Sequence, residues 1–240
     1  MSNTFENKTE QMFSRQSLMF DEAQLMRRCV ILGCGFIGSN LAHNLMKTGF
    51  QRFLLVDFDT IGTENLLNQN YFADDVGLMK KQALANHLIE FSPLDMDIDI
   101  DDNIENIISG KVELFDWDIV FLSPDNLQIR KKFINWLIVK QKNGELTDII
   151  LVVVGTNSDM ILFHLIQHSI EWIENLLKLY SGDESNYSTG ICGNKSAYFM
   201  GSLVSGLVIS YLKNDFLGQS TPRVIQKMWL NNESVLVDID

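Results

Sequence analysis

Apolar residues recur along the chain in two alternating patterns. Short and nearly continuous apolar runs have the length of buried strands, and they lie at residues 29–32, 52–59, 117–123 and 148–155. Segments with apolar residues at helical spacing lie between them, at residues 39–47, 80–91 and 126–140. Because strands that alternate with helices form parallel sheets covered on both faces, we predict an α/β fold with a mostly parallel sheet.

The flanking segments add further predicted elements. Residues 15–28 and 161–180 have largely helical spacing, and residues 195–213 form an apolar helix. The acidic stretch DMDIDIDDN (95–103) alternates as a solvated edge strand does, and VIQKMWL and SVLVDID predict a C-terminal β-hairpin. We expect a helical arm over residues 1–28 and a single domain over residues 29–240.

The first strand leads into a glycine-rich turn, VILGCGFIGSN (30–40). In such a turn Gly33 permits the sharp bend, Gly35 lets a phosphate approach the backbone and Gly38 lets the helix pack on the strand. The helix that begins with Phe36 and Ile37 would offer unpaired N–H groups to that phosphate. Asp57, at the tip of the next strand, is placed to bind a ribose. These elements form the mononucleotide-binding half of a Rossmann-type sheet, which suits an NAD-dependent dehydrogenase and an ATP-using enzyme equally.

Charge and cysteine content narrow the class of protein. The net charge of −12 would repel nucleic acid and anionic membranes, so neither is an expected partner. Three cysteines (Cys29, Cys34 and Cys192) form no CxxC pair, which indicates a reducing compartment and no structural zinc. The polar N-terminus and the short apolar runs predict a cytoplasmic protein without a signal peptide or membrane span.

Further motifs along the chain distinguish an ATP-using enzyme from an NAD-dependent dehydrogenase. FSRQ (13–16), the glycine turn, VDFDTIGTENLLNQNYFADDVGLMK (56–80) and SPDN (123–126) occur in that order over nearly the whole chain. Together they resemble the E1-like superfamily, which comprises the ThiF/MoeB/HesA adenylyltransferases and the activating enzymes of ubiquitin-like modifiers. A dehydrogenase has no reason to carry the motifs other than the glycine turn.

The resemblance implies MgATP-dependent adenylylation of the C-terminal carboxylate of a small ubiquitin-like or sulfur-carrier protein or of a peptide. It implies a homodimer, in which Arg15 reaches the partner's ATP, and an Mg²⁺ ion held by Asp125. The further residues that it places around ATP are Asp57, Asp59, Asn65, Asn68, Gln69, Lys80 and Asn126, beside the turn residues Gly33, Gly35, Phe36, Ile37 and Gly38.

Simpler interpretations of the same residues stay open from the sequence. Asp59 and Asn65 could shape a turn, Lys80 could begin a solvated helix, and Asp125 could cap the helix that follows. Arg130 is equally suited to a salt bridge and to a ligand contact.

One position departs from the family pattern. The family usually has an arginine where this chain has Asn68, in NLLNQ, and an amide brings no positive charge to a triphosphate. Either Arg52, Lys81 or Arg130 replaces that charge, or the chain is a weakened member that supplies Arg15 to an active partner.

The segment GICGNKSAYFMG (190–201) resembles the region around the catalytic cysteine of compact modifier-activating enzymes. Cys192 would then accept the activated acyl group as a thioester. The alternative interpretation is that Cys192 is only a small buried residue at the end of a loop. Three function classes follow: an adenylyltransferase, a catalytically weakened partner subunit, and an NAD-dependent oxidoreductase.

Overall fold

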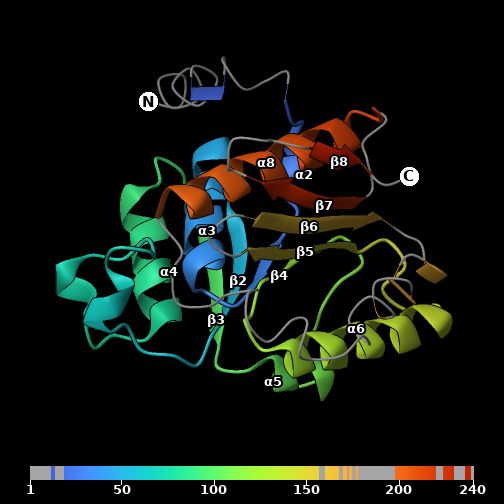
Figure 1. Cartoon of the computed structure of the whole chain (residues 1–240), viewed down its shortest axis with the longest axis horizontal. Coiled ribbons are helices and arrows are strands. Elements are labelled where there is room, and N and C mark those ends of the chain that lie inside the picture. Colours follow the sequence, from blue (N-terminus) through green and yellow to red (C-terminus); the bar gives the residue numbers. More distant parts are fainter. Residues whose placement is uncertain are drawn as a thin grey trace, which may run out of the picture.

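Eight strands form one sheet in the order β3-β2-β1-β4-β5-β6-β7-β8 (Figure 1). The computed structural model of the chain describes residues 12–13, 19–156, 160–167, 170, 171, 173, 174, 177, 198–219, 224–229 and 236–238. The strands are β1 (Cys29–Leu32), β2 (Arg52–Val56), β3 (Asp97–Asp101), β4 (Ile119–Leu122), β5 (Ile150–Thr156), β6 (Met160–Gln167), β7 (Val224–Trp229) and β8 (Leu236–Asp238). Strands β1 to β5 are parallel, and β6, β7 and β8 continue the sheet in antiparallel fashion. The predicted α/β fold with a mostly parallel sheet is confirmed.

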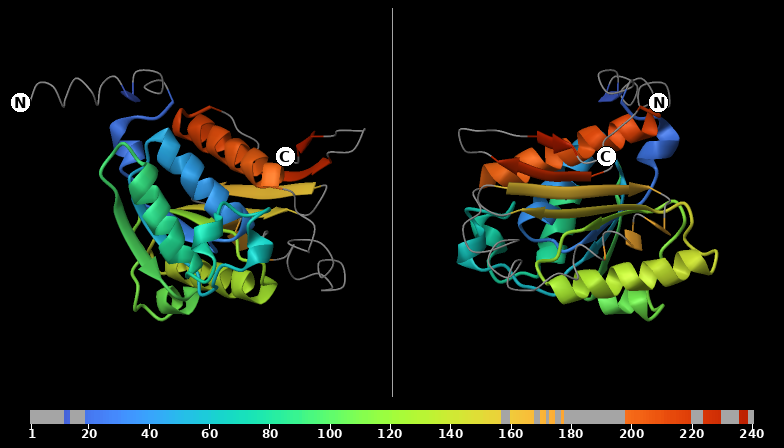
Figure 2. Two further views of the ribbon diagram at one scale, coloured as in Figure 1. Left: turned by 90° about the vertical axis from the view of Figure 1, so that its left-hand side faces the viewer. Right: turned by 45° about the vertical axis from the view of Figure 1, so that its right-hand side comes forward.

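Helices cover both faces of the parallel part (Figure 2). One face carries α3 (Phe36–Thr48), α4 (Lys80–Phe91) and α8 (Tyr198–Phe216), and the other carries α5 (Ile104–Ile108) and α6 (Leu127–Lys142). Successive residues of a strand point to opposite faces, so Cys29 and Ile31 enter one core whereas Val30 and Leu32 enter the other. This double burial explains why the strands are continuous apolar runs.

Local signals fix the ends of several helices. Helix α3 stops at Gly49, which adopts a left-handed conformation with φ +112° that costs glycine little. Helix α6 starts after Asn126, whose side chain accepts hydrogen bonds from the N–H groups of Gln128 and Ile129. The short helix α2 (Glu22–Leu25) has a capping box between Asp21 and Gln24. It lies within the predicted helical arm, most of which falls outside the described residues.

The prediction of a largely helical segment at residues 161–180 is wrong for its first part. Residues Met160–Gln167 form β6, which pairs antiparallel with β5, and helical backbone appears at residues 170, 171, 173, 174 and 177. An apolar stretch such as MILFHLIQ has no clear period, so pairing with β5 decides its conformation. The predicted C-terminal hairpin is present as β7 and β8, and the acidic edge strand is present as β3.

Candidate functional site

The register of the sheet aligns the ends of its three central strands. Leu32 at the end of β1 pairs with Val56 of β2 and with Leu122 of β4. Gly33, Asp57 and Ser123 follow these residues and therefore leave the sheet side by side. Here the chain order reverses, since β1 lies between β2 and β4, and the carboxyl edge at such a point is where open α/β sheets bind ligands.

The segment after β4 is attached directly to the glycine turn. The Ser123 hydroxyl donates to the carbonyl oxygens of Leu32 and Gly33 at 3.1 and 3.0 Å, and the Ser123 N–H donates to Leu32 at 3.0 Å. Gly33 has φ +95°, and a Cβ there would lie 3.0 Å from the nitrogen of Pro124. Ser123 and Pro124 thus lie directly against the glycine turn.

The three turn glycines differ in what a side chain would meet. A Cβ on Gly38 would clash with the carbonyl oxygen of Gly33, which confirms that this glycine allows close packing of helix and strand. A Cβ on Gly35 would meet no atom within 4 Å, so the space in front of Gly35 is open. Helix α3 begins there without a side-chain cap, so its first N–H groups, those of Phe36 and Ile37, have no partner within the helix.

Asp57 holds the glycine turn through its carboxylate. One oxygen accepts the Cys34 N–H at 2.7 Å and the other accepts the Asp59 N–H at 2.8 Å. Burial raises the pKa of the Asp57 carboxyl, and the hydrogen bonds to Asp59 and Cys34 and the charge of Lys80 offset only part of that rise. Each oxygen keeps a second lone pair with which it can accept a hydroxyl group.

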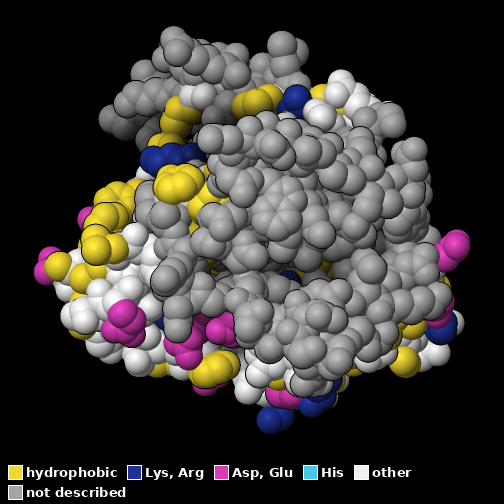
Figure 3. Space-filling view, in the orientation of Figure 1, with side chains coloured by type: hydrophobic (Ala, Val, Ile, Leu, Met, Phe, Trp, Pro, Cys, Tyr) yellow, Lys and Arg dark blue, Asp and Glu magenta, His cyan; other side chains and the backbone are white. Residues whose placement is uncertain are grey.

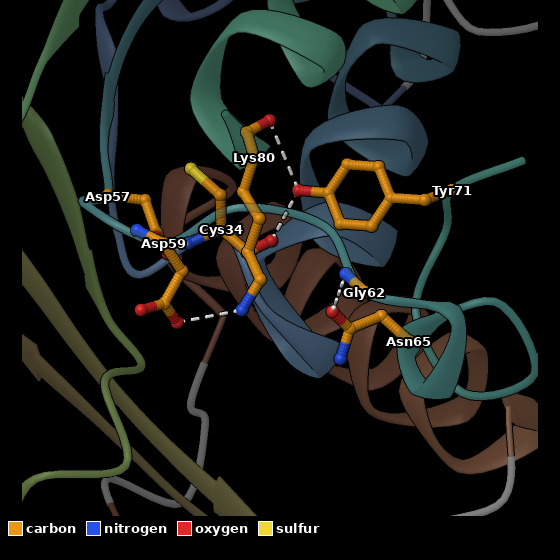
Figure 4. Close-up of polar contacts among 7 residues, drawn as sticks. All are labelled: Cys34, Asp57, Asp59, Gly62, Asn65, Tyr71 and Lys80. Carbon is orange, nitrogen blue, oxygen red and sulfur yellow. Dashed lines mark hydrogen bonds and ion pairs between the residues drawn. The ribbon is translucent and has the colours of Figure 1, made fainter. Parts of the chain in front are cut away.

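The segment between β2 and α4 folds back onto the turn (Figure 4). The ammonium of Lys80 lies 2.8 Å from the Asp59 carboxylate, and the Lys80 side chain is only 9% exposed. The Tyr71 hydroxyl, which sequence analysis did not single out, donates to the carbonyl oxygens of Cys34 at 2.5 Å and Lys80 at 3.3 Å. In the sequence Tyr71 is only a tyrosine in the polar connection between β2 and α4, with no signal of where its hydroxyl will lie. Lys80 is therefore no solvated helix start.

Two amides in this segment have free acceptors. The side-chain oxygens of Asn68 and Gln69 are buried, and neither accepts a hydrogen bond from the residues that the structure describes. Asn65 does shape a turn, since its side-chain oxygen accepts the Gly62 N–H at 2.9 Å. Its amide nitrogen stays available for a ligand.

The segment after β4 exposes a carboxylate and an amide side chain to solvent. Asp125 and Asn126 are both exposed, and Asn126 rather than Asp125 caps α6. No hydrogen bond or ion pair joins the Asp125 carboxylate to any described residue, so it is free to bind a cation. No three His, Cys, Asp or Glu side chains meet as a metal group within the described residues. A metal at Asp125 would therefore need ligands from water or a nucleotide, as Mg²⁺ usually has.

Arg130 lies one helical turn after Asn126 and is buried, with 1% of its surface exposed. Its Nε donates to the carbonyl oxygen of Pro124 at 2.5 Å. Both terminal nitrogens lack a hydrogen-bond partner, and no described carboxylate forms an ion pair with it. The salt-bridge interpretation of Arg130 thus finds no support in the described part of the chain.

Two of the predicted site residues, Arg15 and Cys192, lie outside the described residues. Cys29 and Cys34 are buried, and burial raises the pKa of each thiol well above its ordinary value, so neither is a nucleophile. None of the helices in the described part combines the length and apolar character needed to cross a membrane.

The coloured part of the face drawn in Figure 3 carries charges of both signs. Figure 3 shows acidic and basic side chains scattered among each other on the visible face, while hydrophobic side chains gather at its left flank, toward α4. Ile89 and Phe91 at the end of α4 are exposed, as are Leu67 and Phe72 in the preceding connection. The coloured part of this face carries no broad basic patch of the kind that binds nucleic acid.

Comparison with known proteins points to one family. The model of the ThiF family matches residues 14–229. Among curated proteins, the SUMO-activating enzyme subunit uba-2 of Caenorhabditis elegans is 31% identical over 112 residues, which are 45% of this chain and 19% of that protein. The NEDD8-activating enzyme E1 catalytic subunit of Arabidopsis thaliana is 29% identical over 43% of this chain and 23% of its own length. The matches thus span less than a third of these relatives.

Solved structures share the fold. Escherichia coli MccB, crystallised with AMPCPP and SeMet MccA, superposes with a TM-score of 0.66 at 20% identity over 94% of this chain and 65% of that chain. E. coli tRNA N6-threonylcarbamoyladenosine dehydratase, TcdA, superposes with a TM-score of 0.63 at 17% identity over 87% of this chain and 95% of that chain.

Proposed function

The chain belongs to the ThiF family, and on that premise we propose that it uses MgATP to adenylylate a carboxylate. The observation that carries the proposal is that three segments lie together at one edge of the sheet. They are the glycine turn, the chain segment 57–80 and the segment that contains Asp125. A carboxylate of the substrate would attack the α-phosphate, and pyrophosphate would leave. Relatives that activate ubiquitin-like proteins and the MccB complexes with a peptide support a protein or peptide tail as the substrate.

The proposed roles follow the geometry. The first N–H groups of α3, from Phe36 to Gly38, would donate to phosphate oxygens across the open space at Gly35. Asp57 would accept a ribose hydroxyl with its free lone pairs while it holds the turn. Lys80, kept in place by Asp59, and the amides of Asn65, Asn68, Gln69 and Asn126 would border the phosphates.

ATP and Mg²⁺ fit the residues that are present. The space at Gly35, the uncapped start of α3 and the terminal nitrogens of Arg130, which have no partner among the described residues, all suit an anion. The free carboxylate of Asp125 suits a hard cation. When bound, Mg²⁺ would neutralise part of the phosphate charge. The protein's own groups would align the reactants and stabilise the charge that develops.

Two extensions of the proposal concern residues outside the described part. Arg15 would complete the site of a second copy, which makes a homodimer the active form. Cys192 would accept the acyl group from AMP and release the nucleotide. A cytoplasmic location accompanies these proposals, since free cysteines and activated carboxylates both suit a reducing interior.

Exchange of labelled pyrophosphate into ATP tests the function. The assay would use the full chain with candidate tail peptides, and we expect exchange that depends on the peptide. Asp125→Ala should abolish exchange, because the metal would lose its protein ligand. Asp99→Ala is the matched control, since Asp99 is an exposed carboxylate on edge strand β3. Equal activity of wild type and Asp125→Ala would refute the proposed role of Asp125, and absence of exchange with every peptide would refute the adenylyltransferase.

One observation favours a second candidate, a weakened subunit that assists an active partner. Asn68 is a neutral amide with a buried and unpaired oxygen at the position of the family arginine. This candidate predicts little exchange by the wild-type chain and a gain on Asn68→Arg. An NAD-dependent oxidoreductase, by contrast, would bind NAD tightly and ATP not at all, which a titration with each nucleotide decides.

A further inference from the structure

The charge missing at Asn68 has three candidate replacements, and the structure separates them. Arg52 pairs with Asp97 at 3.1 Å where β2 begins, which is the opposite end of the sheet from the glycine turn. Lys81 is buried and pairs with Asp102. Arg130 alone of the three has no anionic partner among the described residues.

The surroundings of Arg130 call for an anion. A guanidinium carries five N–H donors, and only Nε is used here, by the carbonyl oxygen of Pro124. At 1% exposure no bulk water compensates the charge, and a buried cation without a partner is strongly unfavourable. Its position in the first turn of α6 adds to the cost, because the start of a helix is the positive end of its dipole.

The guanidinium also lies beside the candidate site. Pro124, which it contacts, packs against Gly33, and Ser123 is hydrogen-bonded to the same glycine turn. Asp125 and Asn126, the next two residues, are exposed, so a ligand can approach this segment from solvent, and it would have to displace the groups that bury the terminal nitrogens of Arg130. Lys80 and Lys81 are also close enough to the glycine turn to act on Cys34, but each is paired with a carboxylate, Asp59 and Asp102 respectively. Arg130 is thus the cation near this edge whose charge no described carboxylate balances.

We infer that Arg130 binds phosphate oxygens of the nucleotide and supplies the positive charge that Asn68 lacks. The inference rests on the proposed function, because it assumes that the anion at this edge is a polyphosphate. The free N–H groups of the guanidinium form a planar fork that matches phosphate geometry. An arginine buried before the ligand arrives would also be held ready, so less side-chain entropy is lost on binding.

Nucleotide binding by the full chain tests the inference. ATP and adenosine would be titrated against the wild type, Arg130→Met and Arg130→Lys. We expect Arg130→Met to weaken ATP binding about 10- to 100-fold, as for loss of a hydrogen-bonded charge. Its affinity for adenosine should stay within about twofold of the wild type. Arg130→Lys should weaken ATP less than Arg130→Met does. Arg52→Gln, which removes a positive charge at the far end of the sheet, is the matched control and should leave ATP affinity unchanged.

A structural role would give a different result. If Arg130 only holds Pro124 in place, its variants would weaken ATP and adenosine equally, and that outcome, like unchanged ATP affinity, would overturn the inference. If Arg130→Met does not fold, Arg130→Lys decides: a loss of at least about threefold for ATP alone supports the inference, and an unchanged ratio of ATP to adenosine affinity overturns it.

Pyrophosphate exchange, measured in parallel, keeps the two proposals apart. A wild type that binds ATP through Arg130 and exchanges with no tail peptide would refute the function and leave the inference standing. Normal exchange with unchanged ATP affinity in the variants would refute the inference alone. A wild type that binds no ATP would refute both.

Discussion

The Tyr71 hydroxyl lies 2.5 Å from the carbonyl oxygen of Cys34 and joins two segments that are 37 residues apart. The same hydroxyl reaches the carbonyl oxygen of Lys80 at 3.3 Å. One side chain therefore connects the glycine turn, the segment after β2 and the start of α4. Burial raises the pKa of the Tyr71 hydroxyl well above its ordinary value, so the group stays protonated and remains a donor.

Tyr71→Phe should lower the free energy of unfolding by about 1–2 kcal/mol, because it leaves two carbonyl oxygens without this donor. It should also weaken ATP binding several-fold, because the glycine turn would lose its hydrogen bond to the segment that leads into Lys80. Urea denaturation and nucleotide titration measure the two effects. Tyr211→Phe on α8 would serve as a matched control for removal of a hydroxyl and should leave ATP affinity unchanged. Unaltered ATP affinity in Tyr71→Phe would contradict the proposed link.

Alanine at two turn glycines should separate folding from binding. Gly38→Ala would push a methyl group into the carbonyl oxygen of Gly33 and should lower the free energy of unfolding by roughly 2–3 kcal/mol. Gly35→Ala would point its methyl group into open space and should change stability by less than about 1 kcal/mol.

ATP binding should nonetheless weaken about tenfold or more in Gly35→Ala, because the methyl group would occupy the space of a phosphate. Thermal unfolding followed by nucleotide titration distinguishes the two variants. A stable Gly35→Ala protein with wild-type ATP affinity would show that no phosphate approaches the turn at that glycine.

His43 should make stability depend on pH. Burial, with smaller contributions from the charges of His87 and Lys47, lowers the pKa of His43 to about 4 from an ordinary value of 6.5. Between these values the unfolded chain binds a proton that the folded chain does not, so stability falls as the pH drops from about 6.5 toward 4. The loss attributable to this group should be about 2 kcal/mol, allowing for its partial exposure.

The measurement compares wild type and His43→Gln by urea denaturation at pH 7 and pH 4.5. Glutamine does not titrate, so the variant should lose less stability than the wild type over this interval. Equal losses in the two proteins would mean that His43 does not set the slope. The carboxyl groups titrate in both proteins, so their contribution to the loss of stability cancels in the comparison.

The buried ion pair of Arg28 and Asp118 should support the fold without touching the site. Its two charges lie 2.7 Å apart at the beginnings of β1 and β4, far from the edge that carries the glycine turn. Asp118→Ala would leave a buried cation unpaired and should cost about 3 kcal/mol of stability. Asp97→Ala breaks the exposed pair with Arg52 and should cost less than about 1 kcal/mol.

Below its melting temperature Asp118→Ala should bind ATP as the wild type does. Differential scanning calorimetry and nucleotide titration test both halves of the prediction. Weaker ATP binding by the folded variant would mean that the two ends of β1 and β4 are coupled.

Much of the site was predictable because it is local in the sequence. The glycine turn, Asp57 and the SPDN segment each follow a recognisable strand, and parallel strands bring their ends to one edge. Asp59 and Lys80 were predicted separately, and the structure joins them as an ion pair. The role of Tyr71 was missed because a tyrosine in a connection carries no signal of where its hydroxyl will lie. Strand β6 was mistaken for helix because its apolar run has no distinct period.

The sequence alone determined the order of strands and helices, the glycine turn and the family, since periodicity, turn residues and ordered motifs are written along the chain. Tertiary structure alone decided which polar groups acquire partners. Lys80, Lys81 and Arg130 are all cations in helical positions. Packing gives each lysine a carboxylate, whereas among the described residues Arg130 has only a carbonyl oxygen. Burial and pairing depend on residues far apart in the chain, so their energetic consequences arise only when the sheet assembles.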